Sequence, residues 1–193
     1  MLKSKVAVIL AGGKSSRMQM DKALLPFGAY NSLAEYQYRR LSSLFEKVYL
    51  STKENKFDFE ASIIKDVNND ASPLLALVSI FEKLSLDDFF VLSVDAPFVE
   101  EKVIKKLYEA DALNFDVIVA QSRHGIEPLC AIYHRSFLSK AKQALEANEH
   151  RLKSLLDTLK IKRVKIEEER FFMNLNYPKD YEEAQAQSRL TLL

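Results

Sequence analysis

The residues best suited to chemistry lie in one short stretch, residues 10–26, with the sequence LAGGKSSRMQMDKALLP. Two of the four glycines in the chain, Gly12 and Gly13, stand side by side there. Glycine adopts backbone angles that other residues avoid, and it lets a ligand approach the main chain closely. Hydroxyl groups and three positive charges follow, the charges being on Lys14, Arg17 and Lys22. A loop of this composition is suited to hold a polyanion, and we predict a phosphate chain.

The spacing of this loop differs from two well-known phosphate-binding motifs. It matches neither the GxxxxGK[ST] pattern of P-loops nor the GxGxxG pattern of dinucleotide-binding folds. A glycine-rich turn with solvated lysines is the alternative interpretation. The presence of Arg17 and of the pair Asp21-Lys22 in the same stretch favours a phosphate-binding loop.

A second candidate is Asp95, which follows the apolar run of residues 89–94. A carboxylate after so apolar a segment is costly unless it has a partner. Mg²⁺ is a natural partner, since it takes oxygen ligands and often shares them with substrate phosphates. The sequence therefore predicts Asp95 as a metal ligand. An aspartate that caps the following turn is the alternative.

The apolar pattern predicts strands that alternate with helices, which is typical of an α/β fold with a mostly parallel sheet. We expect strands at residues 6–10, 47–51, 62–66, 87–95, 117–120 and 127–133, and an exposed edge strand at 162–166. We expect helices at residues 33–44, 73–84, 100–112, 137–147, 152–159 and 179–187, with Ser32 and Ser72 as N-caps of the first two.

Ligands of such sheets bind beyond the carboxyl ends of the strands. Gly12, Asp66 and Asp95 each lie at or just past the end of an expected strand. The architecture alone therefore gathers these three residues at one edge of the sheet.

Length and composition are those of one globular domain, residues 1–193, with residues 188–193 expected as a loose tail. A net charge of +1 gives no reason to expect a nucleic acid or a membrane as partner. The single cysteine, Cys130, excludes an internal disulfide and is expected as a small buried residue. No signal peptide or apolar span is apparent, so we expect a cytoplasmic protein. Three histidines lack metal-ligand spacing and are expected at the surface: His124, His134 and His150.

Residues 10–26 resemble the motif LAGGxSxRMGxDK of nucleotidyltransferases that activate small molecules with an NTP. Within them, the chain is most similar to the molybdenum cofactor guanylyltransferases of the MobA-like NTP transferase family. The matching positions are Leu10, Ala11, Gly12, Gly13, Ser15, Arg17, Met18, Asp21 and Lys22, whereas Gln19 replaces a glycine. The resemblance implies a Rossmann-like three-layer α/β/α fold of the nucleotide-diphospho-sugar transferase type.

Two further segments resemble family motifs on the nucleotide side. The sequence VDAPF at residues 94–98 is similar to the CDxPF box, whose aspartate binds the metal. Asp66 and the following SPL at residues 72–74 are similar to a D…GPLAG segment that lines the nucleotide pocket, with Ser72 and Ala76 in place of two glycines. Ser51 ends a strand where family members often carry an asparagine near the base.

Two others resemble motifs on the acceptor side. The sequence NLNYPKD at residues 174–180 is similar to the NxNTPED box, so either Asn174 or Asn176 would hold the metal shell or the acceptor phosphate. Tyr177 replaces a threonine there. Residues 127–133 are similar to an HPxxALY segment, with Glu127 in place of the histidine.

The resemblance implies transfer of GMP from GTP to the terminal phosphate of molybdopterin or the molybdenum cofactor, with Mg²⁺ as cofactor and pyrophosphate as product. The implied catalytic residues are Arg17, Lys22 and Asp95, the last as metal ligand. The implied nucleotide-binding residues are Leu10, Ala11, Gly12, Gly13, Ser15, Lys22, Ser51, Asp66 and Asp95. Molybdoenzyme chaperones or other cofactor-synthesis proteins are the implied partners.

Two alternatives remain open from the sequence. The same loop would serve a molybdopterin cytidylyltransferase or a sugar-phosphate or polyol-phosphate nucleotidyltransferase. A non-catalytic protein that binds a nucleotide or a molybdoenzyme chaperone is the other alternative. Three departures from the family pattern favour the latter: Gln19, Glu127 and Tyr177. The intact motif residues argue against it: Arg17, Asp21, Lys22 and Asp95.

Overall fold

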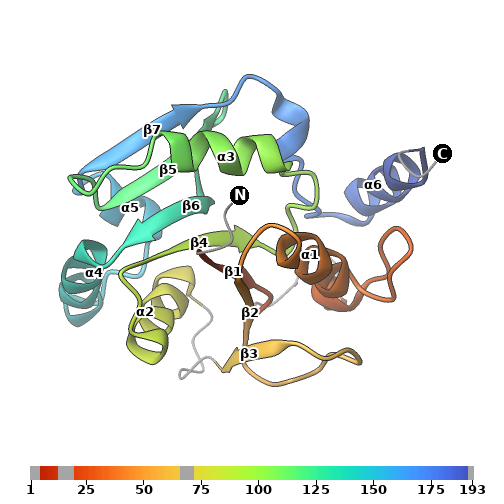
Figure 1. The fold of residues 1–193 in the computed structure, drawn as a ribbon, viewed down its shortest axis with the longest axis horizontal. Coiled ribbons are helices and arrows are strands. Elements are labelled where there is room, and N and C mark those ends of the chain that lie inside the picture. Colours follow the sequence, from red (N-terminus) through yellow and green to blue (C-terminus); the bar gives the residue numbers. More distant parts are fainter. Residues whose placement is uncertain (1–4, 13–19, 66–71, 191–193) are drawn as a thin grey trace.

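The computed structural model describes residues 5–12, 20–65 and 72–190. These ranges form a seven-stranded sheet with helices on both faces (Figure 1). The strands are β1 (Val6–Leu10), β2 (Lys47–Thr52), β3 (Ser62–Lys65), β4 (Asp88–Ser93), β5 (Val117–Ser122), β6 (Gly125–His134) and β7 (Ile161–Lys165). Their order across the sheet is β3-β2-β1-β4-β6-β5-β7, and β6 alone runs antiparallel to its neighbours.

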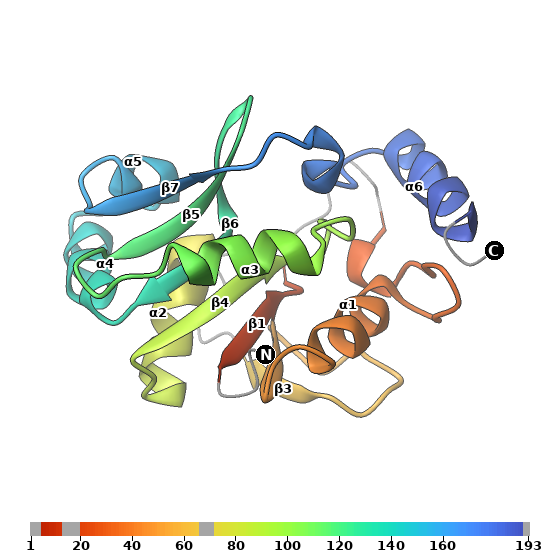
Figure 2. The same ribbon diagram turned by 45° about the horizontal axis from the view of Figure 1, so that its top comes forward.

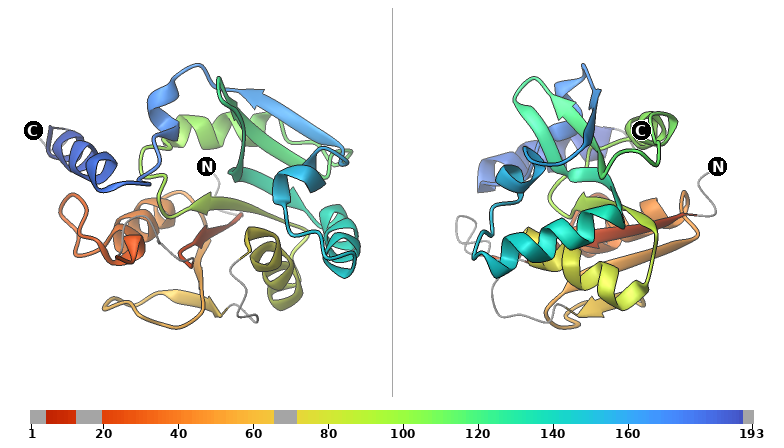
Figure 3. Two further views of the ribbon diagram at one scale, coloured as in Figure 1. Left: turned by 180° about the vertical axis from the view of Figure 1, so that it is seen from behind. Right: turned by 90° about the vertical axis from the view of Figure 1, so that its left-hand side faces the viewer.

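The helices divide between the two faces of the sheet. They are α1 (Leu33–Ser42), α2 (Pro73–Leu84), α3 (Glu101–Glu109), α4 (Ser136–Glu146), α5 (Leu152–Leu156) and α6 (Pro178–Leu190), with short 3₁₀ helices η1 (Lys22–Leu24) and η2 (Glu169–Phe172). The core on one face includes α1 and α3, and the core on the other includes α2, α4 and α5. Figure 3 shows α2 and α4 side by side on their face. None of the described helices is long and apolar enough to cross a membrane.

The central strand β1 explains why the sheet has two covered faces. Ala7 and Ile9 belong to one core, whereas Val8 and Leu10 belong to the other. Because successive side chains of a strand point to opposite faces, a continuous apolar run fits only a strand that is covered on both sides. The three-layer α/β/α architecture predicted from the sequence is therefore confirmed.

Several element ends differ from expectation. Strand β4 stops at Ser93, because the chain then turns and the Ala96 amide donates to the Ser93 carbonyl at 3.2 Å. Ser32 caps α1 through its hydroxyl, but the Ser72 hydroxyl donates to the His150 carbonyl instead of capping α2. Helices α3 and α5 end earlier than expected, at Glu109 and Leu156.

The expectation of a loose tail is wrong for part of it, because α6 continues through Leu190. Ala184 is buried on the core side of this helix. Within its last turns the Ser188 hydroxyl donates to the Gln185 carbonyl at 2.9 Å. Residues 191–193 lie outside the described part of the chain.

Backbone hydrogen bonds tie the carboxyl ends of three neighbouring strands together. The Ala11 amide donates to the Ser51 carbonyl at 2.9 Å, and the Val94 amide donates to the Leu10 carbonyl at 3.1 Å. The C-terminal segment joins the same edge, since the Leu175 amide donates to the Asp95 carbonyl at 2.9 Å. In Figure 2 this segment, with η2 and α6, lies at the end of the sheet toward which β1 points.

The Gln37 side chain of α1 hydrogen-bonds to the turn that carries Asp95. This side chain is fully buried, and its amide nitrogen donates to the Ala96 carbonyl at 3.0 Å and to the Val94 carbonyl at 3.4 Å. Two carbonyls that flank Asp95 therefore accept hydrogen bonds from one side chain.

We predict that Gln37→Ala lowers the free energy of unfolding by about 1–3 kcal/mol, because buried carbonyls lose their donor. Urea denaturation measures this loss. The control is Gln143→Ala, at an exposed position of α4. Equal unfolding midpoints for the two variants would contradict the supporting role of Gln37.

Candidate active site

The local structure of η1 positions the Lys22 side chain. Asp21 caps this short helix, since its Oδ1 accepts a hydrogen bond from the Ala23 amide at 3.0 Å. Lys56 forms an ion pair with the other oxygen of Asp21 and donates to the Ala11 carbonyl at 3.2 Å. The cap and the ion pair together fix the backbone from which Lys22 extends.

The Lys22 ammonium lies between a carboxylate and an amide oxygen. Its Nζ donates to Asp95 Oδ2 at 3.1 Å and to Asn176 Oδ1 at 2.9 Å. The side chains of Lys22 and Asp95 are only 13% and 20% exposed, so water screens this ion pair less than a pair on the surface. The other oxygen of Asp95 accepts a hydrogen bond from the Ser93 hydroxyl at 2.6 Å.

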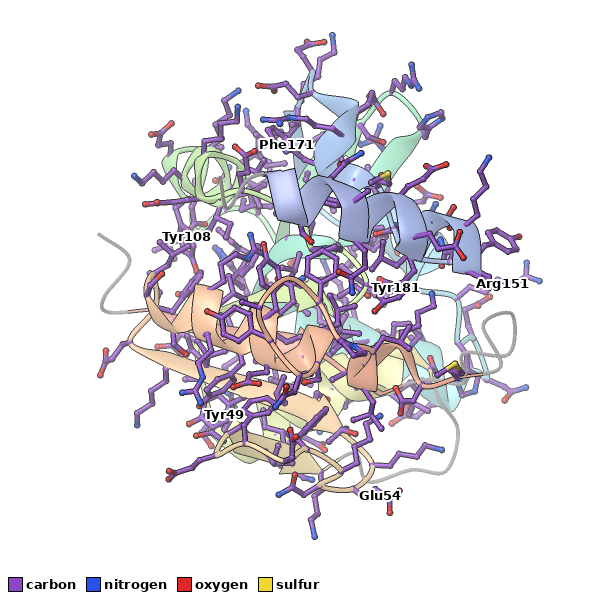
Figure 4. All side chains as sticks on the ribbon, turned by 90° about the vertical axis from the view of Figure 1, so that its right-hand side faces the viewer. Tyr49, Glu54, Tyr108, Arg151, Phe171 and Tyr181 are labelled. Carbon is purple, nitrogen blue, oxygen red and sulfur yellow. The ribbon has the colours of Figure 1, made fainter. Side chains whose placement is uncertain are left out.

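Asn176 is positioned by the start of α6. The Asp180 carboxylate accepts hydrogen bonds from the amides of Asn176 and Tyr177, at 3.0 and 2.8 Å. The positive end of the helix dipole also stabilises a carboxylate in the first turn of a helix. Tyr181 points from α6 toward the segment before α1, where its hydroxyl donates to the Pro26 carbonyl (Figure 4). Helix α6 therefore holds Asn176 against the segment that carries Lys22.

A cavity of about 230 Å³ opens beside Asp95. It is lined by the end of β4, the start of β6 and the C-terminal segment: Ser93, Asp95, Ala96, Val99, Glu127, Pro128, Leu129, Cys130, Phe172 and Asn174. Polar oxygen atoms of several chain segments thus meet apolar side chains in one hollow, which is typical of small-molecule sites.

Glu127 brings a half-buried carboxylate to this cavity. Its Oε1 accepts a hydrogen bond from the Ser122 hydroxyl at 2.8 Å. Burial raises the pKa of Glu127 above its usual range, and the nearby Glu169 carboxylate adds to the rise. Hydrogen bonding from Ser122 and the charges of Lys153 and His124 oppose it.

The structure brings together most of the predicted site residues that it describes. Lys22 contacts both Asp95 and Asn176, and Asn174 lines the same cavity as Asp95. The main chain of Leu10, Ala11 and Ser51 forms the hydrogen bonds between strand ends, and Gly12 is exposed next to them. Four predicted residues lie outside the described part of the chain: Gly13, Ser15, Arg17 and Asp66.

Sequence reasoning missed two residues of the site. Lys56 comes from a polar connection with no recognisable motif, so no sequence signal identifies it. Ser93 carried a weak signal, since it stands two residues before Asp95. The expectation of a surface histidine is wrong for His134, which is 6% exposed and lies 2.8 Å from the Asp111 carboxylate. Cys130 is buried as predicted, and burial raises its pKa.

The residues present fit a magnesium ion. The Asp95 carboxylate and the Asn176 amide oxygen converge on one positive charge, that of Lys22, and the Asn174 amide lies beside Asp95. All are hard oxygen donors, which Mg²⁺ prefers, and Mg²⁺ commonly uses one carboxylate together with substrate phosphates and water. The described residues contain no group of three or more His, Cys, Asp or Glu side chains that could hold a metal on their own.

The chain belongs to the family of the MobA-like NTP transferase domain, whose family model matches residues 7–164. It is 40% identical over 184 residues to a molybdenum cofactor guanylyltransferase from Campylobacter jejuni, covering 94% of this chain and 96% of that protein. It is 37% identical over 181 residues to one from Helicobacter pylori, covering 91% and 89%.

Solved structures share the fold. Molybdopterin-guanine dinucleotide biosynthesis protein A from Archaeoglobus fulgidus superposes with a TM-score of 0.81 at 21% identity, covering 98% of this chain and all of that one. The 2-C-methyl-D-erythritol 4-phosphate cytidylyltransferase from Thermus thermophilus superposes with a TM-score of 0.73 at 16% identity, covering 97% and 99%. The fold is therefore that of the nucleotide-diphospho-sugar transferases.

We predict that Glu127→Gln stabilises the protein at neutral pH. A raised pKa in the folded state means that the ionised form of Glu127 opposes folding. This cost is absent below the pKa of the unfolded chain, grows between that pKa and the raised pKa of the folded protein, and is fully present above the latter. Thermal unfolding at neutral and acidic pH should show a higher melting temperature for the variant at neutral pH, with the difference vanishing in acid.

The control is Glu167→Gln, whose side chain is exposed after β7. If Glu127→Gln were less stable than wild type at neutral pH, the contacts of the carboxylate would stabilise the folded protein by more than its burial destabilises it.

Proposed function

We propose that this protein transfers GMP from GTP to the terminal phosphate of molybdopterin or the molybdenum cofactor and releases pyrophosphate. The observation that carries the proposal is the convergence of Lys22, Asp95 and Asn176 on one point at the carboxyl edge of the sheet. The names of the relatives, which match this chain over nearly its whole length, supply the substrates. Proteins that make or receive the cofactor are the proposed partners. With one cysteine and no possible internal disulfide, a cytoplasmic setting is part of the proposal.

The reaction joins two anions. An oxygen of the acceptor phosphate attacks the α-phosphorus of GTP, and the bond from that phosphorus to the bridging oxygen of pyrophosphate breaks. No proton has to be removed from an ionised phosphate, so the barrier is charge crowding at the α-phosphorus. Positioning and fixed positive charge lower such a barrier.

Each described residue has a distinct part in this scheme. The Lys22 ammonium neutralises charge that grows at the α-phosphate, and the main chain of residues 10–12 borders the phosphates. Asn176 orients the ammonium through its 2.9 Å contact. From the sequence, Arg17 and the loop residues Gly13 and Ser15 hold the remaining phosphates.

Asp95, with Asn174 or Asn176 beside it, would hold Mg²⁺. A bound Mg²⁺ supplies Lewis-acid stabilisation of the α-phosphate and aligns attack and departure. With Asp95 holding the cation, the Lys22 ammonium would turn from the carboxylate to the charge that grows at the α-phosphate in the transition state. The Ser93 hydroxyl would keep the carboxylate oriented through its hydrogen bond to the other oxygen.

We predict that Asp95→Ala abolishes pyrophosphate release while the protein stays folded, because the substitution removes the proposed metal ligand. Turnover with GTP, molybdopterin and Mg²⁺ measures the first effect, and circular dichroism checks the second. Asp58→Ala, at an exposed position before β3, is the control. A folded Asp95→Ala protein with near wild-type turnover would exclude Asp95 as the metal ligand.

We predict that Lys22→Ala lowers kcat by about 10²–10³-fold and leaves KM for GTP nearly unchanged, as expected for a group that acts mainly in the transition state. Steady-state kinetics separate the two parameters. Lys105→Ala, at an exposed position of α3, should behave as wild type. A variant that only raises KM would make Lys22 a ground-state phosphate clamp.

We predict that a screen of the four NTPs, with and without molybdopterin, yields pyrophosphate with GTP and only when the acceptor is present. Asp66, which lies outside the described residues, is the residue we expect to select guanine, since a carboxylate accepts both the N1–H and N2–H donors. Asp66→Asn should therefore lower kcat/KM for GTP relative to CTP. A wild-type preference for CTP would place the protein among cytidylyltransferases, and an unchanged preference in the variant would assign base selection to the main chain.

A further inference from the structure

The cavity beside Asp95 lies on one definite side of the proposed catalytic centre. Strands β3, β2 and β1 stand on one side of β4 in the sheet, and β6, β5 and β7 stand on the other. Leu10, Ala11 and Gly12 end or follow β1, and Lys22 comes after them in the chain. The cavity is instead walled by β6 and the C-terminal segment. The end of β1 and the β6 wall of the cavity therefore lie on opposite sides of β4, the strand that leads to Asp95.

A bulge in β6 forms part of the cavity wall. Ala131 pairs with Val119 of β5, but the next pair along β5 joins Ala120 to Glu127, so residues 128–130 have no partner there. Pro128 suits this bulge because it has no amide to donate to a ladder. The Tyr133 hydroxyl fixes the bulge by donating to the Pro128 carbonyl at 2.9 Å. Bulges of this kind re-aim side chains next to active sites.

The bulge leaves Glu127 with unused hydrogen-bonding capacity. A carboxylate has about four acceptor positions. Within the described part of the chain, Ser122 is the one residue that donates to Glu127. Asp95, on the opposite wall, already accepts from both Lys22 and Ser93. Glu127 is therefore the cavity carboxylate that is best able to accept further donors from a ligand.

The charges of the cavity determine which end of an acceptor can approach Glu127. A phosphate is repelled by this carboxylate, whereas Lys22 attracts a phosphate to the far side of Asp95. A planar neutral ring with adjacent N–H donors suits Glu127, because one carboxylate can accept both hydrogen bonds. The half-buried ring of Phe172 and the side chains of Val99 and Leu129 supply apolar surface for such a ring.

We propose that Glu127 is a specificity-determining residue that binds the heterocyclic end of the acceptor by accepting hydrogen bonds from adjacent N–H groups, such as a pterin ring offers. The proposal rests on the proposed function, since it concerns the acceptor of that reaction. It assigns a positive role to the residue that departs from the histidine of the HPxxALY segment.

The probe is 6-hydroxymethylpterin, a fluorescent pterin without phosphate, titrated into the protein without nucleotide. In Glu127→Gln the side chain presents a donor in place of one acceptor oxygen, so we expect affinity for the probe to fall about tenfold or more. Glu127→Asp, which keeps the charge on a shorter side chain, should lose less. Glu167→Gln, at an exposed position, should bind as wild type. Binding of Mg²⁺-GTP should be the same in all four proteins.

Equal affinity of wild type and Glu127→Gln for the probe would overturn the proposal, as would a wild type that does not bind it. A loss of GTP affinity in Glu127→Gln would also overturn it, because the carboxylate would then bind guanine. Failure of the proposed function has a different signature. In that case neither the wild type nor any of the variants transfers GMP, while binding of the pterin still depends on Glu127.

Discussion

One largely buried ionic contact determines how this molecule is arranged around its site. Lys22 meets Asp95 and Asn176, which are 73 and 154 residues away along the chain. A carboxylate after an apolar strand and a largely buried ammonium are each costly alone, and each provides the partner that the other needs. The contact requires that η1, the end of β4 and the start of α6 meet at one edge of the sheet. The hydrogen bonds of Asp21, Gln37 and Asp180 to nearby main-chain groups hold these three segments in place.

The order of strands divides the site around that contact. The parallel strands β3, β2, β1 and β4 end at the same edge, and backbone hydrogen bonds join the ends of β2, β1 and β4. The antiparallel strand β6 begins at that edge, and its bulge turns Glu127 toward a cavity. A two-substrate reaction fits this arrangement, because the two sides of Asp95 differ in charge and in shape.

Much of this arrangement is predictable from the sequence, because it depends on local pattern. Continuous apolar runs identify strands that are covered on both faces, and strand ends then place Asp95 at the same edge as Gly12. The contact of α6 with Pro26 and the pair of Lys56 with Asp21 join distant segments without a local pattern, so they needed the structure. The bulge at Pro128 depends on pairing with β5, and the burial of His134 depends on Asp111, which precedes that strand. Gly13, Ser15, Arg17 and Asp66 lie outside the described residues, and their roles stay predictions.

The most direct test of nucleotidyl transfer at this site follows the fate of each phosphate of GTP. The protein is incubated with molybdopterin, Mg²⁺ and GTP labelled in either the α- or the γ-phosphate, and the products are separated. If the α-phosphorus is attacked, the α-label appears in a product that contains the pterin, and the γ-label appears only in pyrophosphate. Transfer of the γ-label to the acceptor, or no α-label in any pterin product, would contradict this account of the site.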